Sequence, residues 1–254
     1  MAAETEIRSD EIDPHRPAIV EYYQTMFDMS NAIMEESFAD PGRVALHGKS
    51  HLFVEELEKW VKTIQPRPEA KLISRAAREY QFALLALALG HYQHAFKGLR
   101  LVLELTLQTV HLSAHTLDLH EWLAGRKDTN WSELMADNGV FSKRYADAFY
   151  PDLRDHVAHF RGLSERLYRE CSEAVHGNVR KHIPMPDGLQ FDRESFKIWH
   201  DKADIMAMAV TFALVLRYLH QISTPSARLH EPAVMQYLGH ISAVRHSFGA
   251  TGGE

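Results

Sequence analysis

Apolar side chains recur at steps of three and four residues along one stretch of the chain, from Asp152 to His176. The members of this apolar stripe are Leu153, Val157, Phe160, Leu167, Cys171 and Ala174. Such spacing places side chains on one face of an α-helix. Pro151 suits the first turn of this helix and Gly177 suits its end, because glycine readily adopts the left-handed backbone of a helix terminus. The stretch therefore predicts a long amphipathic helix.

Six further segments have helical spacing and end at residues typical of helix boundaries. We expect these helices at residues 17–37, 51–64, 69–89, 92–116, 192–222 and 232–247, with short helices between 117 and 150, one of them capped by Asn130 or Thr129. Loops are expected at 39–49, around Pro41-Gly42, and at 179–191, as a loop or small hairpin. Pro225 is expected to end the segment before it.

The segment 92–116 is the one place where an extended conformation competes with a helix. Leucines alternate with other residues from Leu99 to Leu107, as they would along a strand. We expect a helix, because leucine favours helices, β-branched residues do not cluster here and no flanking segment offers a partner strand. The resulting prediction is an all-α fold, a multi-helix bundle in one domain at 15–248, between flexible segments at 1–14 and 249–254.

Composition limits the classes of function. The chain has 254 residues, 45% of them hydrophobic, and a formal net charge of −6, so any RNA-binding surface has to be a local basic patch. The single cysteine, Cys171, excludes an intramolecular disulfide and a zinc site built from several thiolates, and we expect it in the core. The acidic N-terminus lacks a secretory signal, and no apolar run is long enough to span a bilayer. We therefore expect a cytoplasmic protein with no membrane contact.

A polar stripe runs beside the apolar one on the 152–176 helix. Glu165, Arg169, Ser172 and His176 are spaced by four, three and four residues and so share one face. His176 would lie at the helix C-terminus, where the helix dipole favours a protonated imidazole. The simplest interpretation is a surface ion pair between Glu165 and Arg169 with a histidine at the helix end. The functional interpretation is a site for phosphate binding and proton transfer.

This polar stripe resembles the site of the HEPN superfamily (higher eukaryote and prokaryote nucleotide-binding). Active members carry an Arg, four to six residues and then a His near the end of a long helix, and Arg169 and His176 fit that pattern. The ending Ser-Glu-Ala-Val-His-Gly-Asn, residues 172–178, is similar to the Ser-x-x-Val-His-Gly ending of helical proteins grouped near HEPN. Residues 99–104, Leu-Arg-Leu-Val-Leu-Glu, resemble the Leu-Arg-x-x-Leu-Glu segment of an earlier core helix. The resemblance covers residues 76–178.

The resemblance implies a HEPN-like bundle and a metal-independent endoribonuclease that acts in a prokaryotic toxin or phage-defence system. His176 would serve as general base or acid, and Arg169 would hold the scissile phosphate. Ser172 would bond the phosphate or orient the imidazole. Glu104 or Arg100 would orient these groups from the earlier helix. The resemblance also implies RNA as substrate, no cofactor, a homodimer with a shared site and an accompanying protein from the same system.

Three other interpretations stay open. Arg-His pairs with the allowed spacing also occur at Arg8/His15, Arg154/His159 and Arg193/His200. Of these, Arg154/His159 is the second candidate, because an Asp follows the Arg, as in many active members, whereas Glu170 follows Arg169. A bundle of this kind can also be a non-catalytic module that binds a partner protein or RNA.

A metal site is the third open interpretation. Closely spaced histidines place imidazoles on one helix face, and Glu173-x-x-His176 matches half of a di-iron carboxylate site. The histidines with such spacing are His91 with His94, and His111 with His115, followed by His120. No second Glu-x-x-His occurs, so we expect no metal.

Overall fold

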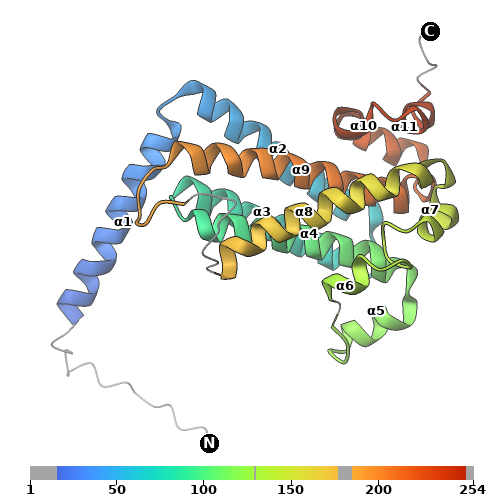
Figure 1. Ribbon diagram of the computed structural model, residues 1–254, viewed down its shortest axis with the longest axis horizontal. Helices are drawn as coiled ribbons and strands as arrows, with labels where there is room; N and C mark the ends of the chain where they lie inside the picture. The colour runs from blue at the N-terminus through green and yellow to red at the C-terminus, as the bar shows by residue number, and fades with distance from the viewer. Residues whose placement is uncertain (1–15, 129, 177–184, 250–254) are drawn as a thin grey trace, which may run out of the picture.

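The computed structural model describes residues 16–128, 130–176 and 185–249 (Figure 1). Within these ranges the protein consists of helices joined by short connections and contains no strand. The predicted all-α, multi-helix bundle is therefore confirmed. The segments expected to be flexible, 1–14 and most of 249–254, lie outside the described residues.

Six long helices form most of the bundle. They are α1 (Arg16–Phe38), α2 (Pro41–Ile64), α3 (Ala70–Ala88), α4 (Tyr92–Ala114), α8 (Val157–His176) and α9 (Arg193–Tyr218). The shorter elements are α5 (Thr116–Leu123), α6 (Trp131–Leu134), α7 (Lys143–Phe149), η1 (Pro151–His156), η2 (Leu219–Gln221), α10 (Thr224–Leu238) and α11 (Ser242–Ser247).

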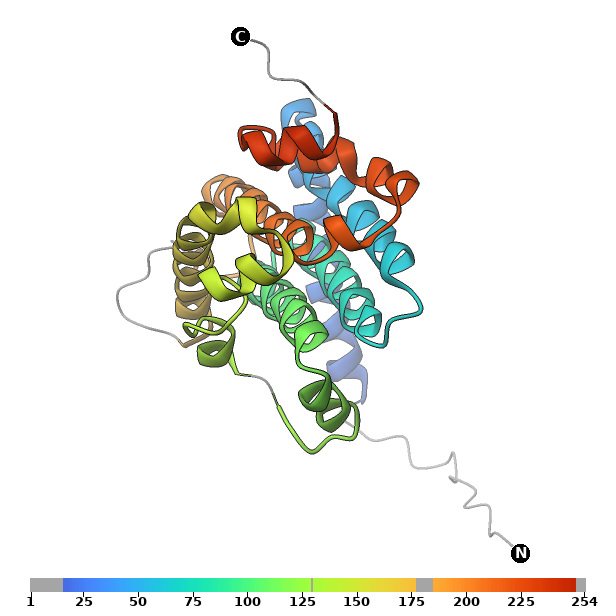
Figure 2. The ribbon, with the colours of Figure 1, turned by 90° about the vertical axis from the view of Figure 1, so that its right-hand side faces the viewer.

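Helix α4 is the centre of the bundle, and it packs against α3, α8 and α9. Figure 2 shows α3, α4 and α8 side by side. Because neighbours cover α4 on several sides, side chains of both alternating sets are buried, including Leu99, Val102, Leu103 and Leu107. The alternating leucines are therefore compatible with a helix. Gly98 brings α3 and α4 close together, since a Cβ at this position would lie 2.5 Å from the Cβ of Ala83.

Helix α9 crosses the core next to α4. Its continuation through η2, Arg193–Gln221, is the one helix in the described part of the chain that is long and apolar enough to cross a bilayer. In this structure 78% of its apolar window is buried inside the bundle. Burial of this extent is typical of a helix in a protein core. Core helices can meet the same length and hydropathy criteria as membrane-spanning helices.

The prediction of a loop at 39–49 is wrong, because α2 begins at Pro41. Asp40 caps this helix, and its side chain accepts a hydrogen bond from the backbone N–H of Arg43 at 3.0 Å. Proline in the first turn loses no intrahelical hydrogen bond and is preset for helical φ. Gly48 consequently lies inside a helix, in open space.

The C-terminal helices also differ from the prediction. Pro225 lies in the first turn of α10, after the cap Ser223, and therefore begins a helix. Pro232 lies inside α10, so the helix expected at 232–247 is instead the second half of α10 followed by α11. The helix predicted from Asp152 starts as the separate 3-10 helix η1. The expected cap Asn130 is confirmed, since it accepts a hydrogen bond from the N–H of Glu133.

Helix α1 crosses one end of the bundle, and its N-terminal part projects beyond the other helices (Figure 1). Its C-terminal half buries Ser30, Ile33 and Ser37. The beginning of α4, the beginning of α9 and the end of α8 lie at this same end of the molecule. The candidate catalytic pair on α8 therefore lies toward the end of the bundle that α1 crosses.

Candidate functional site

Arg169 lies on the exposed side of α8. Its guanidinium makes no hydrogen bond or ion pair with any residue that the structure describes. The ion pair that the simplest interpretation expects between Glu165 and Arg169 is absent, because Glu165 pairs with the Nε of Arg161 at 3.0 Å. Arg161 also reaches Asp137 at 3.3 Å, so its guanidinium bridges two carboxylates. Arg169 is thus available to an external anion.

His176 is the last residue of α8. Its side chain lies outside the described residues, as do Gly177 and Asn178 of the motif. The backbone nevertheless fixes its place seven positions after Arg169, which is about two turns of helix. Both residues therefore belong to one side of α8, as the spacing predicts.

Ser172, the third member of the polar stripe, is partly buried. Its hydroxyl donates a hydrogen bond to the backbone carbonyl of Tyr168 at 2.6 Å. Serine often bonds the preceding helical turn in this way. The hydroxyl oxygen retains acceptor capacity, but its proton is directed into the helix and away from a bound phosphate.

Glu104 and Arg100 of α4 do reach α8, as the sequence predicts, but they meet Tyr168. The Nη2 of Arg100 donates to the Tyr168 hydroxyl at 2.6 Å and lies 3.4 Å from the carboxylate of Glu104. The guanidinium carbon also lies 4.4 Å from the centroid of the Tyr168 ring. Burial and the Glu104 carboxylate raise the pKa of Tyr168, which keeps its hydroxyl protonated. These groups thus hold α8 against α4.

Trp131 of α6 completes this contact. Its indole stacks on the Tyr168 ring with centroids 3.8 Å apart and planes 8° from parallel. Sequence reasoning identified Tyr168 only as a residue that flanks Arg169 and did not foresee its contact with Trp131. The available signal was the tyrosine directly before Arg169, although its two partners lie on separate helices.

Glu170, which departs from the common HEPN pattern, forms an ion pair with Lys202 of α9. The two side chains are only 16% and 21% exposed, respectively. The negative charge that the sequence places beside Arg169 is therefore neutralised within the protein. The pair also joins α8 to α9 at Glu170, the residue that follows Arg169.

Cys171 is fully buried on the apolar stripe, as predicted. Burial raises the pKa of its thiol to about 12, so the thiol stays protonated at neutral pH. A buried, protonated thiol is a poor nucleophile and a poor metal ligand. Cys171 is a core residue.

The second candidate pair, Arg154/His159, is separated between two elements. Arg154 lies in η1 and donates from Nη1 to both carboxylate oxygens of Asp147, at 2.7 and 2.6 Å. His159 lies on the exposed side of α8, with its ring edge against Phe160. Because Asp147 already neutralises Arg154, this pair is less suited to hold a phosphate than Arg169.

The histidine pairs do not form metal sites. Within the described ranges, no group of three or more His, Cys, Asp or Glu residues could hold a metal ion. The His111 and His115 rings are stacked, with their centroids 4.1 Å apart. Burial is the main cause that lowers the pKa of His111 to about 4, and the neighbouring His115 is the second. The His91 and His94 rings lie edge to face at 6.3 Å. The imidazole of the Glu173-x-x-His176 motif is outside the described residues.

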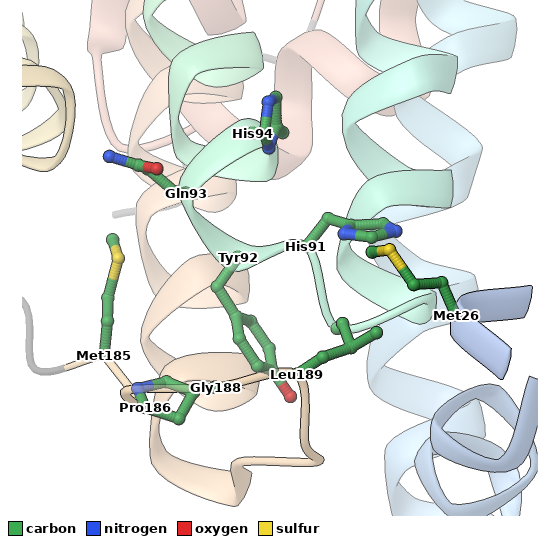
Figure 3. A pocket seen from close by; sticks show the side chains of 10 residues that line it. Met26, His91, Tyr92, Gln93, His94, Met185, Pro186, Gly188 and Leu189 are labelled. Carbon is green, nitrogen blue, oxygen red and sulfur yellow. The ribbon is translucent and has the colours of Figure 1, made fainter. Parts of the chain in front are cut away.

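A pocket of about 320 Å³ lies at the start of α4. Figure 3 shows Met26 beside the His91 ring, and Met185 and Pro186 on the opposite side of the pocket. The pocket is open and lies beside the turn at Gly90, whose φ of 78° favours glycine. Sequence reasoning did not foresee this pocket, because its walls come from α1, α4 and the 185–189 segment.

Comparison with known proteins identifies no relative, since no protein-family model, curated protein or solved structure matches this chain significantly.

Proposed function

We propose that this protein is a metal-independent endoribonuclease whose site lies at the C-terminal end of α8. The observation that carries the proposal is the exposed Arg169, which has no partner among the described residues and shares one side of α8 with His176. A free guanidinium offers the planar donor fork that binds phosphate. As the HEPN resemblance implies, such an enzyme would act as an effector in a prokaryotic toxin or phage-defence system.

In this mechanism His176 removes the proton from a ribose 2′-hydroxyl. The 2′-oxygen forms a bond to phosphorus, the bond to the 5′-oxygen breaks, and the imidazolium returns the proton to that leaving oxygen. The products are a 2′,3′-cyclic phosphate and a 5′-hydroxyl. Arg169 stabilises the negative charge that accumulates on the phosphate oxygens.

Two contacts on either side of Arg169 support this proposal. Tyr168 is bound to Arg100 of α4, and Glu170 is bound to Lys202 of α9. The backbone at Arg169 is therefore held by both neighbours, and precise positioning of a charged group favours catalysis. The pairing of Glu170 also removes the repulsion that a free carboxylate would exert on RNA.

The test is cleavage of end-labelled total and transfer RNA in EDTA by the purified protein and by its His176→Ala and His159→Ala variants. We expect cleavage by the unchanged protein and by the His159→Ala variant, and none by the His176→Ala variant. Loss only in the His159→Ala variant would move the site to Arg154 and His159. Absence of cleavage by every folded variant would contradict the proposal.

A second candidate function, a non-catalytic module that binds a partner protein, is favoured by one observation. Helix α1 leaves several large apolar side chains mostly exposed, including Tyr22, Tyr23 and Phe27. A binding module would lose its partner when these side chains are changed and would be indifferent to the His176→Ala change. The two variants therefore separate the two functions.

A further inference from the structure

The projecting part of α1 carries an unusual amount of exposed apolar surface. Tyr22, Tyr23 and Phe27 are 60%, 65% and 65% exposed, and Ile19 and Val20 are at least half exposed. Isolated exposed apolar residues are common, but contiguous patches of large side chains generally mark interaction sites. Here they follow one another along two turns of a single helix.

A groove lies beside these side chains, between α1 and α3. Its volume is about 510 Å³, and we call it the α1–α3 groove. Met26, Phe27 and Met34 form its wall on α1, and Leu85 of α3 and Leu89, the residue after α3, form the other wall. The groove is therefore shaped and lined for an apolar helix face.

The two helices that flank the groove differ in charge. The charged side chains described on α1 are all acidic, namely Glu21, Asp28, Glu35 and Glu36. The exposed stripe of α3 carries Lys71, Arg75 and Arg78 in line with Phe82 and Leu85, at helical steps of three and four residues. None of these three cations is paired with another described residue. An incoming helix that is apolar and acidic would complement α3, and α1 is such a helix.

We propose that this surface joins two copies of the protein, with α1 of each copy lying in the α1–α3 groove of the other. A two-fold interface uses the same patch on both copies, so that patch must contain both the inserted side chains and the groove that receives them. Here the exposed side chains of α1 lie next to the α1–α3 groove, so one patch contains both. The interface is separate from the proposed ribonuclease chemistry and does not rest on it.

The available area fits a stable dimer. Eight large apolar side chains on α1 and α3 are each about half exposed. At ~200 Å² for each large side chain, they offer on the order of 800 Å² per copy. Standard protein interfaces bury about 800 Å² on each partner. Burial of these side chains around the projecting part of α1 and on α3 would therefore match the area of a standard interface.

The test is sedimentation equilibrium of the full chain at several concentrations, with a Tyr23→Ser/Phe27→Ser double variant. We expect a dimer for the unchanged protein and roughly a hundredfold weaker association for the double variant, because buried aromatic side chains dominate interface energies. The matched control is Leu229→Ser, which changes an equally exposed apolar residue on α10 and should leave the dimer intact. Circular dichroism of each variant establishes that it is folded.

A charge variant tests the same interface independently. Arg75→Glu/Arg78→Glu should weaken the dimer, and the loss should shrink in high salt, where charge repulsion is screened. A monomeric unchanged protein would overturn the proposal, as would a dimer insensitive to the α1 and α3 variants. Binding of the monomer to lipid vesicles through Tyr23 and Phe27 would instead assign α1 to a membrane surface.

Discussion

At the scale of single residues, Tyr168 links the candidate site to the core. Its hydroxyl accepts a hydrogen bond from Arg100, and its ring contacts both the Arg100 guanidinium and the Trp131 indole. The Nε of Arg100 is buried without a partner among the described residues. Arg100 therefore depends strongly on the Tyr168 hydroxyl.

Tyr168→Phe removes that acceptor and keeps the ring. We expect it to lower the free energy of unfolding by about 1–2 kcal/mol, the usual cost of removing a partly buried hydrogen bond to a charged group. Tyr168→Ala should cost more, because both ring contacts are also lost. Urea denaturation of the three proteins measures these differences. A Phe variant as stable as the unchanged protein would mean that water replaces the hydroxyl.

Helical spacing sufficed to predict the environment of individual residues on α8, but not their partners. It correctly placed Arg169 outside and Cys171 inside the bundle. The expected ion pair between Glu165 and Arg169 was wrong. Arg161 and Arg169 are both four residues from Glu165, so helical spacing alone does not distinguish between the two partners. It could not reveal that Lys202 neutralises Glu170, because those residues are 32 positions apart.

At the scale of helices, two glycines in helix interiors have opposite roles. Gly98 of α4 faces Ala83 of α3 at a distance too short for an added Cβ, whereas Gly48 of α2 faces open space. The same substitution should therefore have opposite effects at the two positions.

Gly98→Ala should destabilise the protein by about 1–3 kcal/mol, because α3 and α4 must move apart. Gly48→Ala should stabilise it by about 0.5–1 kcal/mol, because alanine loses less backbone entropy in a helix. Thermal unfolding of both variants measures the effects. Equal shifts in Tm would show that the approach of α3 and α4 is not limited by Gly98.

The sequence predicted most helices but misplaced the starts of the two helices that contain Pro41 and Pro225. Proline commonly interrupts a helix, but Pro41 and Pro225 both lie in the first turn of one. The distinguishing signal is a capping residue one or two positions before the proline, since Asp40 and Ser223 have side chains that cap helix N-termini. Helix α4 was predicted correctly despite its alternating leucines, because leucine content and missing strand partners outweighed the alternation.

At the scale of the whole molecule, buried histidines make the bundle sensitive to acid. Burial is the main cause that lowers the pKa of His200 to about 3 and the pKa of His47 to about 4. His200 bonds the Ser50 hydroxyl at 2.7 Å and contacts the rings of His47, Phe196 and Trp199, and none of these groups carries a negative charge. Both imidazoles are therefore neutral in the folded protein at neutral pH.

Stability should fall as the pH decreases from 6.5 toward 4. In this window the unfolded chain binds protons at these histidines and the folded protein does not, so protonation favours unfolding. Each unit by which a pKa is lowered corresponds to about 1.4 kcal/mol. His200→Gln should flatten this dependence, and His159→Gln, at an exposed position, should not. Urea denaturation across this pH range measures the free energy of unfolding at each pH. An identical pH dependence for all three proteins would contradict the role of His200.

The sequence predicted a single helical bundle, but it could not predict what covers α1. Periodicity shows that α1 has an apolar face, and the structure leaves most of that face exposed because α1 extends past the end of the bundle. In the proposed dimer the covering surface is supplied by another chain. No pattern within one sequence reports that contact.

The most direct test of the proposed site compares two arginines on the same helix. Arg169 and Arg166 are both exposed on α8, and neither is paired with a described residue, but only Arg169 shares the side of His176. We expect Arg169→Ala to slow metal-free RNA cleavage at least ~100-fold, the typical loss when a group that stabilises transition-state charge is removed. Arg166→Ala should retain cleavage, and both variants should keep the Tm of the unchanged protein. Equal rates for the two variants would contradict a specific site at Arg169.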